Sequence, residues 1–227
     1  RVHQKVDAGF DRFARGGHHL PERAVEQALR RIVSQTHQLV AGLRKHPDVV
    51  VLSDEIYSHM LYDGRNHVSL LQYDEMRDRT IMLDGWSKTY AMTGWRLGFA
   101  VWPKAIAETA TRLAINCHSC VNAPTQHAAI AALQGDQSCV DEMLTAFKRR
   151  GALITRLLNQ SEGIRCQPPG GAFYAFANIM DTPFTAHEFQ EKLLEEYGVA
   201  CIAGTSFGGF GEGYVRLSCA NSDEAIE

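Results

Sequence analysis

Short apolar runs alternate with helical stretches along this chain, and this alternation limits its fold more than any other feature of the sequence. Residues 48–53 form a run rich in β-branched side chains, and residues 80–83 and 97–101 form two more. Residues 22–45, before the first run, carry apolar side chains at helical spacing. Runs of this kind are typical of strands buried on both faces of a parallel sheet. The pattern therefore predicts an α/β fold.

The second half of the chain has a different texture. Helices are predicted over residues 103–113, 125–133 and 140–158, followed by strands over 172–176, 199–203 and 214–219, with one more helix over 186–197. This order predicts a small α+β domain, so we expect one domain over residues 1–139 and a second over 140–227. The glycine-rich residues 204–213 run into a strand, whereas a dinucleotide-binding loop would run into a helix, so they predict only a loop.

Charge and composition exclude several classes of partner. The net charge is −3, with 23 basic and 26 acidic residues intermixed. The sequence therefore shows no basic patch that would bind nucleic acid or an anionic membrane surface. No apolar run reaches the roughly 18 residues of a membrane helix, and residues 1–5 open no secretory signal. We therefore expect a cytoplasmic protein with a small-molecule partner.

Six cysteines raise the question of a metal or redox site. Only Cys117 and Cys120 have the spacing of a ligand pair, and a structural zinc site needs four ligands. Reduced thiols without a metal are therefore the expectation.

The most informative stretch is Gly85–Gly98, which follows the second apolar run. It places Lys88 just after a predicted strand, where ligands of open α/β sheets bind, and Arg96 near two glycines that let backbone approach a ligand closely. A guanidinium binds phosphate through paired hydrogen bonds. The alternative is that both are ordinary solvated surface charges.

Ser87–Tyr90 followed by Met92–Gly98 resembles the signature of the class I and II aminotransferases, the fold type I enzymes that use pyridoxal phosphate. Ser53–Tyr57, Gly170–Tyr174 and Arg216–Ser218 match further motifs in the family's order, so the resemblance covers about residues 48–227. It implies part of a mainly parallel, three-layer large domain plus a small C-terminal domain.

The resemblance also implies roles for individual residues. Lys88 would form a Schiff base with the cofactor and move the substrate proton, and Asp54 would pair with the pyridine nitrogen. Tyr57 would bond the phenolic oxygen, while Arg96 and Ser87 would bind the phosphate. From the residues alone, Asp54 could instead cap the following turn, and Tyr57 could be a packed loop aromatic.

Two residues of the second domain complete the expected site. Arg216 lies in a predicted strand, where a buried arginine needs an anion, and the family's equivalent arginine binds the substrate carboxylate. Phe173 is expected to line the same pocket, with a role in the core as the alternative.

The sequence departs from the family in two places. Gly85 stands where similar enzymes usually carry a phosphate-binding serine or threonine, three residues before the lysine. In addition, residues 1–47 show no glycine-rich phosphate loop, no aromatic that stacks on the pyridine ring and no Asn-Pro-Thr-Gly element. The match therefore predicts a chain that lacks much of the family's N-terminal portion.

The leading hypothesis is an aminotransferase that moves an amino group between an amino acid and a 2-oxo acid, as a homodimer by family resemblance. A carbon–sulfur or other β-lyase would use the same Lys88, Asp54 and Arg216. A non-catalytic ligand-sensing domain is the third alternative. It is disfavoured because no basic DNA-binding segment precedes the motif.

Overall fold

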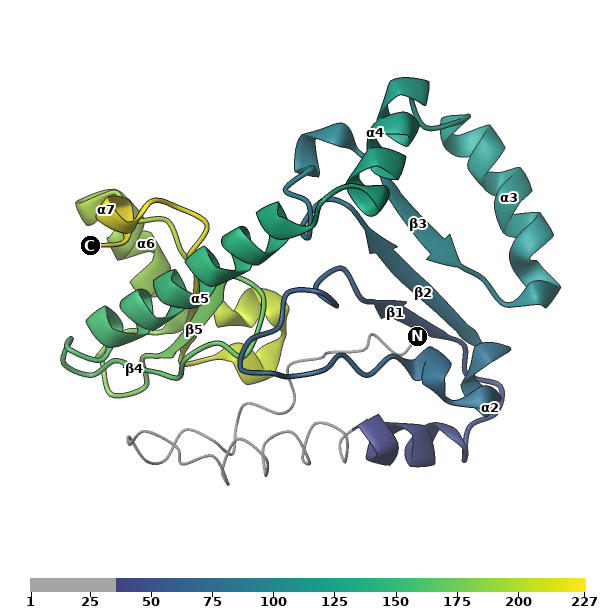
Figure 1. Ribbon diagram of the computed structural model, residues 1–227. Helices are drawn as coiled ribbons and strands as arrows, with labels where there is room; N and C mark the ends of the chain where they lie inside the picture. The colour runs from purple at the N-terminus through teal and green to yellow at the C-terminus, as the bar shows by residue number, and fades with distance from the viewer. Residues whose placement is uncertain (1–35) are drawn as a thin grey trace. The chain divides into compact units, whose positions relative to one another are not determined.

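The computed structural model describes residues 36–227, which divide into two compact units between Val140 and Asp141 (Figure 1). Each unit has its own sheet and its own cluster of buried apolar side chains. Among the described residues, no helix is both long enough and apolar enough to cross a bilayer.

The first unit contains a three-stranded sheet in the order β1-β2-β3, formed by β1 (Val51–Asp54), β2 (Thr80–Gly85) and β3 (Gly98–Val101). The three predicted runs are confirmed as strands. β1 pairs with β2 in parallel, and β2 pairs with β3 antiparallel. Because β1 and β2 are parallel, their carboxyl ends meet at one edge of the sheet.

The expectation that the first strand is buried on both faces is wrong for the described residues. β1 alternates between buried and exposed positions: Val51 is 5% exposed and Leu52 is 53% exposed. Val51 packs into a cluster with Val40, Leu43, Leu70 and Met76. The described helices therefore cover one side of this strand, and period-two burial replaces the continuous burial of a central parallel strand.

A helical turn packs beneath this sheet. Residues 36–43 are helical, whereas residues 22–35 of the predicted helix lie outside the described residues. The Arg79 guanidinium donates to the carbonyl oxygens of Leu43 at 2.8 Å and His46 at 2.6 Å. Leu43 ends the helix and His46 follows it, so Arg79 ties the end of the helix to the start of β2. The short elements η2 (Leu70–Gln72) and α2 (Asp74–Arg77) lead into the same strand.

Two longer helices follow β3. α3 (Lys104–His118) runs five residues beyond its predicted end because residues 114–118 contain no helix breaker, and it stops where Ser119 takes a positive φ of 60°. α4 (Ala123–Gln134) matches its prediction closely. It begins at Asn122, whose side chain accepts a hydrogen bond from the Thr125 amide, as N-cap residues do.

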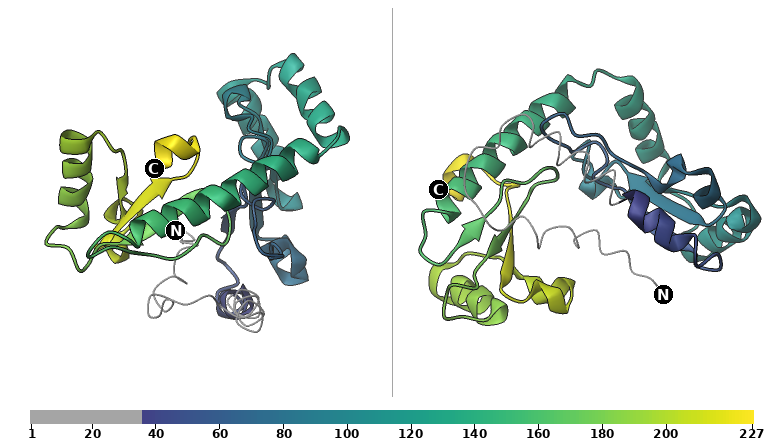
Figure 2. Two further views of the ribbon diagram at one scale, coloured as in Figure 1. Left: turned by 60° about the vertical axis from the view of Figure 1, so that its left-hand side comes forward. Right: turned by 90° about the horizontal axis from the view of Figure 1, so that it is seen from below.

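The second unit is built on a four-stranded antiparallel sheet in the order β4-β5-β7-β6. The strands are β4 (Arg165–Cys166), β5 (Tyr174–Asn178), β6 (Ile202–Ala203) and β7 (Tyr214–Ser218). Helix α5 (Ser138–Leu158) leads into this unit, and its C-terminal half lies along the sheet (Figures 1 and 2). Helices α6 (Ala186–Tyr197) and α7 (Asp223–Ile226) complete it.

The two faces of this sheet differ in character. One face carries the buried side chains of Ala175, Ala177 and Val215, which pack with Ile154 of α5 and Phe189 of α6. Because side chains alternate along a strand, Tyr174, Phe176, Tyr214 and Arg216 belong to the other face. The apolar core and the aromatic face are thus set by the register of β5 and β7.

Three local expectations need correction in this unit. β5 begins at Tyr174 and not at residue 172, since Ala172 has a φ of 55°. The strand expected over 199–203 shortens to Ile202–Ala203, because Gly198 is left-handed and the Val199 amide bonds back to Leu193, closing helix α6. The loop expected over 204–213 is folded into two 3-10 turns, η4 (Gly204–Phe207) and η5 (Gly209–Gly211).

Candidate active site

The ends of β1 and β2 open into a cavity of about 370 Å³ in the first unit. Nine residues line this cavity: Asp54, Ile56, Tyr57, Leu83, Asp84, Ser87, Lys88, Thr93 and Arg96. The set includes every residue that the sequence assigned to cofactor binding. Segments more than forty residues apart in sequence therefore meet at the sheet edge where open α/β proteins bind ligands.

Lys88 lies in a tight turn directly after β2. The Tyr90 amide donates to the Trp86 carbonyl at 3.2 Å, and the Ala91 amide donates to the Lys88 carbonyl at 3.2 Å. The Thr93 hydroxyl also donates to the carbonyl oxygen of Ser87 at 2.8 Å. The turn is thus closed by its own backbone and by one threonine. These hydrogen bonds fix the backbone position of Lys88.

Arg96 adds a second cation to the cavity. It ends the 3-10 turn η3 (Thr93–Trp95) in the left-handed conformation, with φ 56° and ψ 52°. Its Nη1 donates to the Thr93 carbonyl at 2.9 Å. Thr93 therefore contacts both sides of the site, because its hydroxyl holds the Lys88 turn and its carbonyl orients the guanidinium.

The absence of a serine or threonine at position 85 has a steric reason. Gly85 pairs with Gly98 across β2 and β3. A Cβ on Gly85 would lie 2.9 Å from both the Gly98 Cα and the Leu97 carbonyl oxygen, and these are backbone atoms that cannot move aside cheaply. A larger residue at this position would separate β3 from β2, whose end opens into the cavity.

Asp54 lies at the carboxyl end of β1 and caps the next turn. Its Oδ1 accepts a hydrogen bond from the Ile56 amide at 3.2 Å, the capping interaction that the sequence left open. This bond uses one of the two carboxylate oxygens, so the other can still accept from a ligand. Tyr57 follows on the same turn and lines the same cavity.

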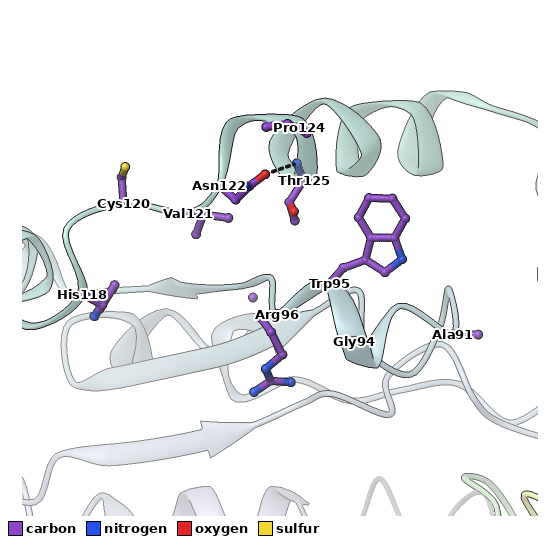
Figure 3. Close-up of a pocket in the computed structure, with 11 residues that line it drawn as sticks. Ala91, Gly94, Trp95, Arg96, His118, Cys120, Val121, Asn122, Pro124 and Thr125 are labelled. Carbon is purple, nitrogen blue, oxygen red and sulfur yellow. Dashed lines mark hydrogen bonds between the residues drawn. The ribbon is translucent and has the colours of Figure 1, made fainter.

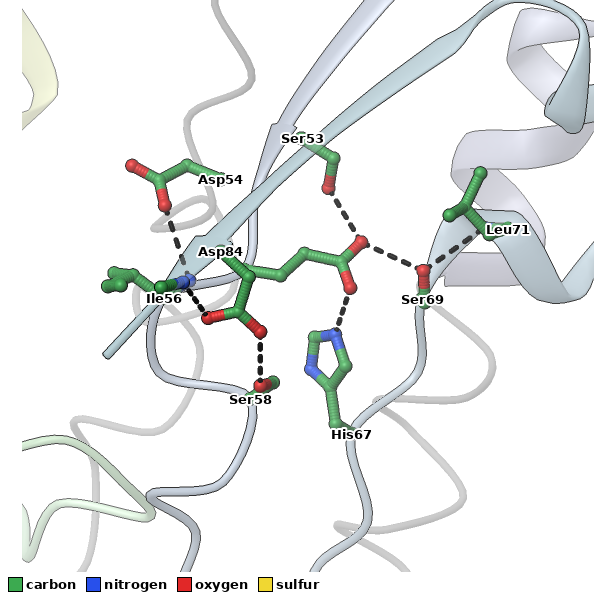
Figure 4. A network of polar contacts seen from close by, with 10 residues as sticks. Ser53, Asp54, Ile56, Ser58, His67, Ser69, Leu71 and Asp84 are labelled. Atoms are coloured by element: carbon green, nitrogen blue, oxygen red, sulfur yellow. Dashed lines mark hydrogen bonds and ion pairs between the residues drawn. The ribbon is translucent and has the colours of Figure 1, made fainter. Parts of the chain in front are cut away.

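A buried network lies beside Asp54 (Figure 4). Glu55 is 7% exposed, and its carboxylate contacts the Ser53 hydroxyl at 3.0 Å, the Ser69 hydroxyl at 2.9 Å and the His67 Nε2 at 2.7 Å. Desolvation raises the pKa of Glu55, but the hydrogen bonds and the charge of His67 outweigh it, so the pKa is lowered overall. Glu55 is therefore a charged group inside the protein.

Asp84, at the end of β2, anchors the other side of the same segment. Its carboxylate accepts from the Ser58 hydroxyl at 3.1 Å and from the Gly85 amide at 2.7 Å (Figure 4). Segment 55–58, which carries Tyr57, is thus fixed at both of its ends by side-chain hydrogen bonds.

A second and larger cavity, of about 960 Å³, also has Arg96 in its lining (Figure 3). It is lined by residues of the Ala91–Gly98 stretch and by residues between His118 and Thr125, where α3 passes into α4. Cys120 lines this cavity, and both Cys117 and Cys120 are free and exposed. The described part of the chain contains no cluster of three or more His, Cys, Asp or Glu side chains that could hold a metal ion.

Arg216 and Phe173, expected at the substrate, belong to the second unit. The Arg216 guanidinium carbon lies 4.4 Å from the centre of the Tyr174 ring and 4.5 Å from the centre of the Phe207 ring. Phe173 packs against Phe147 at 5.2 Å and Tyr174 at 4.6 Å between ring centres. The guanidinium therefore contacts the faces of two aromatic rings, and cation–π interactions with these rings stabilise its positive charge in part.

Sequence reasoning missed Thr93, Glu55 and Asp84. Thr93 and Glu55 stand inside the quoted motifs, and their positions next to assigned residues were the available signal. Two of the three side-chain partners of Glu55, His67 and Ser69, lie 12 and 14 residues away and could not be paired with it from one sequence.

Comparison with known proteins identifies the family. Residues 33–227 match the family described as aminotransferase class I and II. An aspartate aminotransferase from Pyrococcus abyssi is 42% identical over 83% of this chain and 49% of its own length. An aromatic-amino-acid aminotransferase from Thermococcus litoralis is 40% identical over 83% of this chain and 49% of its own length.

Solved structures agree with these relatives. The structure of an aromatic aminotransferase from Pyrococcus horikoshii superimposes with a TM-score of 0.79 at 40% identity, over 84% of this chain and 51% of that chain. An aspartate aminotransferase from Rhizobium meliloti gives 0.78 at 34% identity, over 83% and 49% of the two chains. The predicted α/β pyridoxal-phosphate transferase fold is confirmed, and the chain spans about half the length of the curated relatives it matches. By sequence and by structure, the chain belongs to the class I and II aminotransferase family.

Proposed function

We propose that the protein containing this chain is a pyridoxal-phosphate-dependent aminotransferase, which moves an amino group between an amino acid and a 2-oxo acid. The observation that carries the proposal is the cavity at the ends of β1 and β2. It gathers Lys88, Asp54, Tyr57, Ser87 and Arg96 in one space. Family membership supports the same activity.

The donor set of this cavity fits pyridoxal phosphate. Lys88 is an amine that can bond to an aldehyde carbon, and Arg96 with Ser87 offers a guanidinium and a hydroxyl for a phosphate. Asp54 keeps one carboxylate oxygen for a protonated ring nitrogen, and Tyr57 offers a phenol to a ring oxygen. When bound, the cofactor supplies a ring that accepts the electrons left at the substrate Cα.

The residues of this chain then have distinct tasks. Arg96 and Ser87 bind the phosphate and fix the position of the ring relative to the turn of Lys88. Asp54 holds a negative charge opposite the ring nitrogen, which keeps that nitrogen protonated. The Lys88 amine takes the proton that leaves the substrate Cα, and the closed turn around it keeps the amine within reach.

Arg216 is proposed to bind the substrate carboxylate. A guanidinium that lies between two ring faces has few orientations left, so it can present its paired donors to a carboxylate with little further ordering. Phe173 is proposed to act as a neighbouring pocket residue.

Three further features belong to the proposal. Residues 1–139 are assigned to the cofactor-binding domain, residues 140–227 to the small domain, and the protein to a cytoplasmic homodimer. The dimer rests on family resemblance. Light scattering during gel filtration tests the dimer.

Borohydride reduction with pyridoxal phosphate tests the function. After reduction and digestion, peptide mass mapping should find the pyridoxyl group on Lys88, and Lys88→Arg should lose it. A pyridoxyl group on another lysine would reject the assignment of Lys88. Activity is assayed on a separate, unreduced sample loaded with pyridoxal phosphate, and failure of that sample to transfer an amino group to 2-oxoglutarate from any amino acid would reject the activity.

A further inference from the structure

Glu55 is a buried carboxylate that the proposed chemistry does not use. It follows Asp54 directly, yet the two side chains have different surroundings: Asp54 is exposed and lines the cavity, while Glu55 is 7% exposed and bonds to Ser53, Ser69 and His67. A buried ionised group is costly, and apolar replacements of such groups are often as stable. Its presence therefore calls for a role in addition to stability.

The contacts of Glu55 join the two ends of one loop. Ser53 precedes the loop in β1, and His67 and Ser69 end it before η2. The loop begins with the turn that carries Tyr57, where the Ser58 amide donates to the Glu55 carbonyl at 2.8 Å and the Met60 amide donates to the Tyr57 carbonyl at 2.9 Å. The Glu55 amide also donates to the Leu83 carbonyl of β2 at 2.8 Å.

We propose that Glu55 is a positioning residue, which acts through Ser53, His67 and Ser69 to hold Asp54 and Tyr57 at the cavity. The side chain anchors the turn from the buried side while Asp84 and Ser58 anchor it from the cavity side. The inference rests on the proposed function in one respect, namely that Asp54 and Tyr57 contact the cofactor.

Glu55→Gln and Glu55→Ala should behave differently. In Glu55→Gln the amide oxygen can replace Oε1 and accept from both serines, and the amide nitrogen can donate to His67 if Nε2 is unprotonated. Glu55→Ala leaves Ser53, Ser69 and His67 without this acceptor.

Amide hydrogen exchange of the cofactor-free chain tests the positioning directly. In Glu55→Ala, the amides of Glu55, Ser58 and Met60 should exchange at least tenfold faster than in the parent, while amides of β3 keep the parent rate. Glu55→Gln should resemble the parent, because its amide can still bond to the serines and to His67. Parent-like exchange in Glu55→Ala would overturn the proposal.

A matched control separates positioning from simple loss of stability. Met76→Ala removes a fully buried side chain from the same unit, and Met76 does not line the cavity. It should speed exchange broadly, and the same broad pattern in Glu55→Ala would overturn the proposal.

Cofactor affinity gives an independent result. Titration with pyridoxal phosphate, followed by absorbance, should show affinity at least tenfold weaker in Glu55→Ala and within twofold of the parent in Met76→Ala. Equal affinity in Glu55→Ala and parent would overturn the positioning of Asp54 and Tyr57. If the parent itself does not bind pyridoxal phosphate, the proposed function fails, and the exchange experiment still decides the role of Glu55.

Discussion

Arg216 lies between two aromatic rings, and its replacement should affect substrate binding alone. Arg216→Ala should keep the bound chromophore but lose affinity for the amino acid, since truncating one partner of a buried charge pair costs about 2–5 kcal/mol. Arg216→Lys keeps the charge but loses the planar donors and should fall in between. The measurement is the KM for the amino acid with cofactor saturating. A KM unchanged in Arg216→Ala would contradict the assignment.

Asp54 should give the opposite pattern. Asp54→Asn keeps an oxygen for the Ile56 amide but loses the negative charge, so the turn should survive while the ring nitrogen loses its partner. We expect weaker cofactor binding and a lower kcat even with substrate saturating. Unchanged turnover in Asp54→Asn would rule out the proposed role of this carboxylate.

Glu55 also predicts how stability depends on pH. Its pKa is lower in the folded chain than the ordinary glutamate value of about 4.3, because the bonds and charge of His67 and the bonds of Ser69 and Ser53 outweigh its desolvation. The unfolded chain therefore takes up the proton first as pH falls, and the contribution of Glu55 to stability, present above that value, is lost through the folded pKa. Urea unfolding between pH 6 and 3 should show a smaller loss in Glu55→Gln than in the parent. An identical loss would contradict the prediction.

The motif residues could be read from the sequence because each one stands next to a recognisable strand end. Lys88, Asp54, Tyr57, Ser87 and Arg96 come together in space for that reason: parallel pairing of β1 and β2 brings their loops to one edge. The Glu55 network and the ring contacts of Arg216 depend on side chains from separate segments. Which of those segments will meet cannot be inferred from a single sequence.

Among the elements, the pair of β2 and β3 leaves no room for added volume at Gly85. Gly85→Ala should destabilise the first unit by about 1–3 kcal/mol, as overpacking does, because its Cβ would meet backbone atoms of Leu97 and Gly98 at 2.9 Å. Gly94→Ala is the matched control, since a Cβ there meets nothing within 4 Å. Urea midpoints of both variants test the claim, and equal midpoints would refute it.

The type of each helix and strand was predictable from the sequence. The ends of some elements and the exposed face of β1 were not. Helix α6 begins and ends at the predicted residues because both signals are local: a Thr185 capping box and a left-handed Gly198. β6 shortened because its length depends on pairing with β7, which reaches only Ile202 and Ala203. The exposed face of β1 likewise depends on what packs against it, which the β-branched run does not specify.

For the whole chain, exposed apolar surface and reduced length lead to one prediction. Leu52, Phe99, Val101 and Trp102 are each at least 40% exposed in the first unit, and exposed apolar patches favour association. We predict that the 227-residue chain alone self-associates and transaminates more slowly than a full-length relative. Light scattering and a 2-oxoglutarate assay test both parts. A monodisperse chain that matches the relative's rate would contradict the prediction.

The buried thiols of the second unit can report, by their reactivity, when that unit unfolds. Burial raises the pKa of Cys166 and of Cys219 to about 11, so at neutral pH both are protonated and shielded from alkylating reagents. Cys117 and Cys120, in the first unit, are exposed. A short pulse of iodoacetamide should therefore mark the exposed Cys117, Cys120 and Cys139 in the native chain, and should mark Cys166 and Cys219 only once the second core opens. Counting the labels on each peptide through a denaturant series would then report the opening of that core without any engineered probe. Native-state labelling of all five thiols at one rate would show that the core is already open.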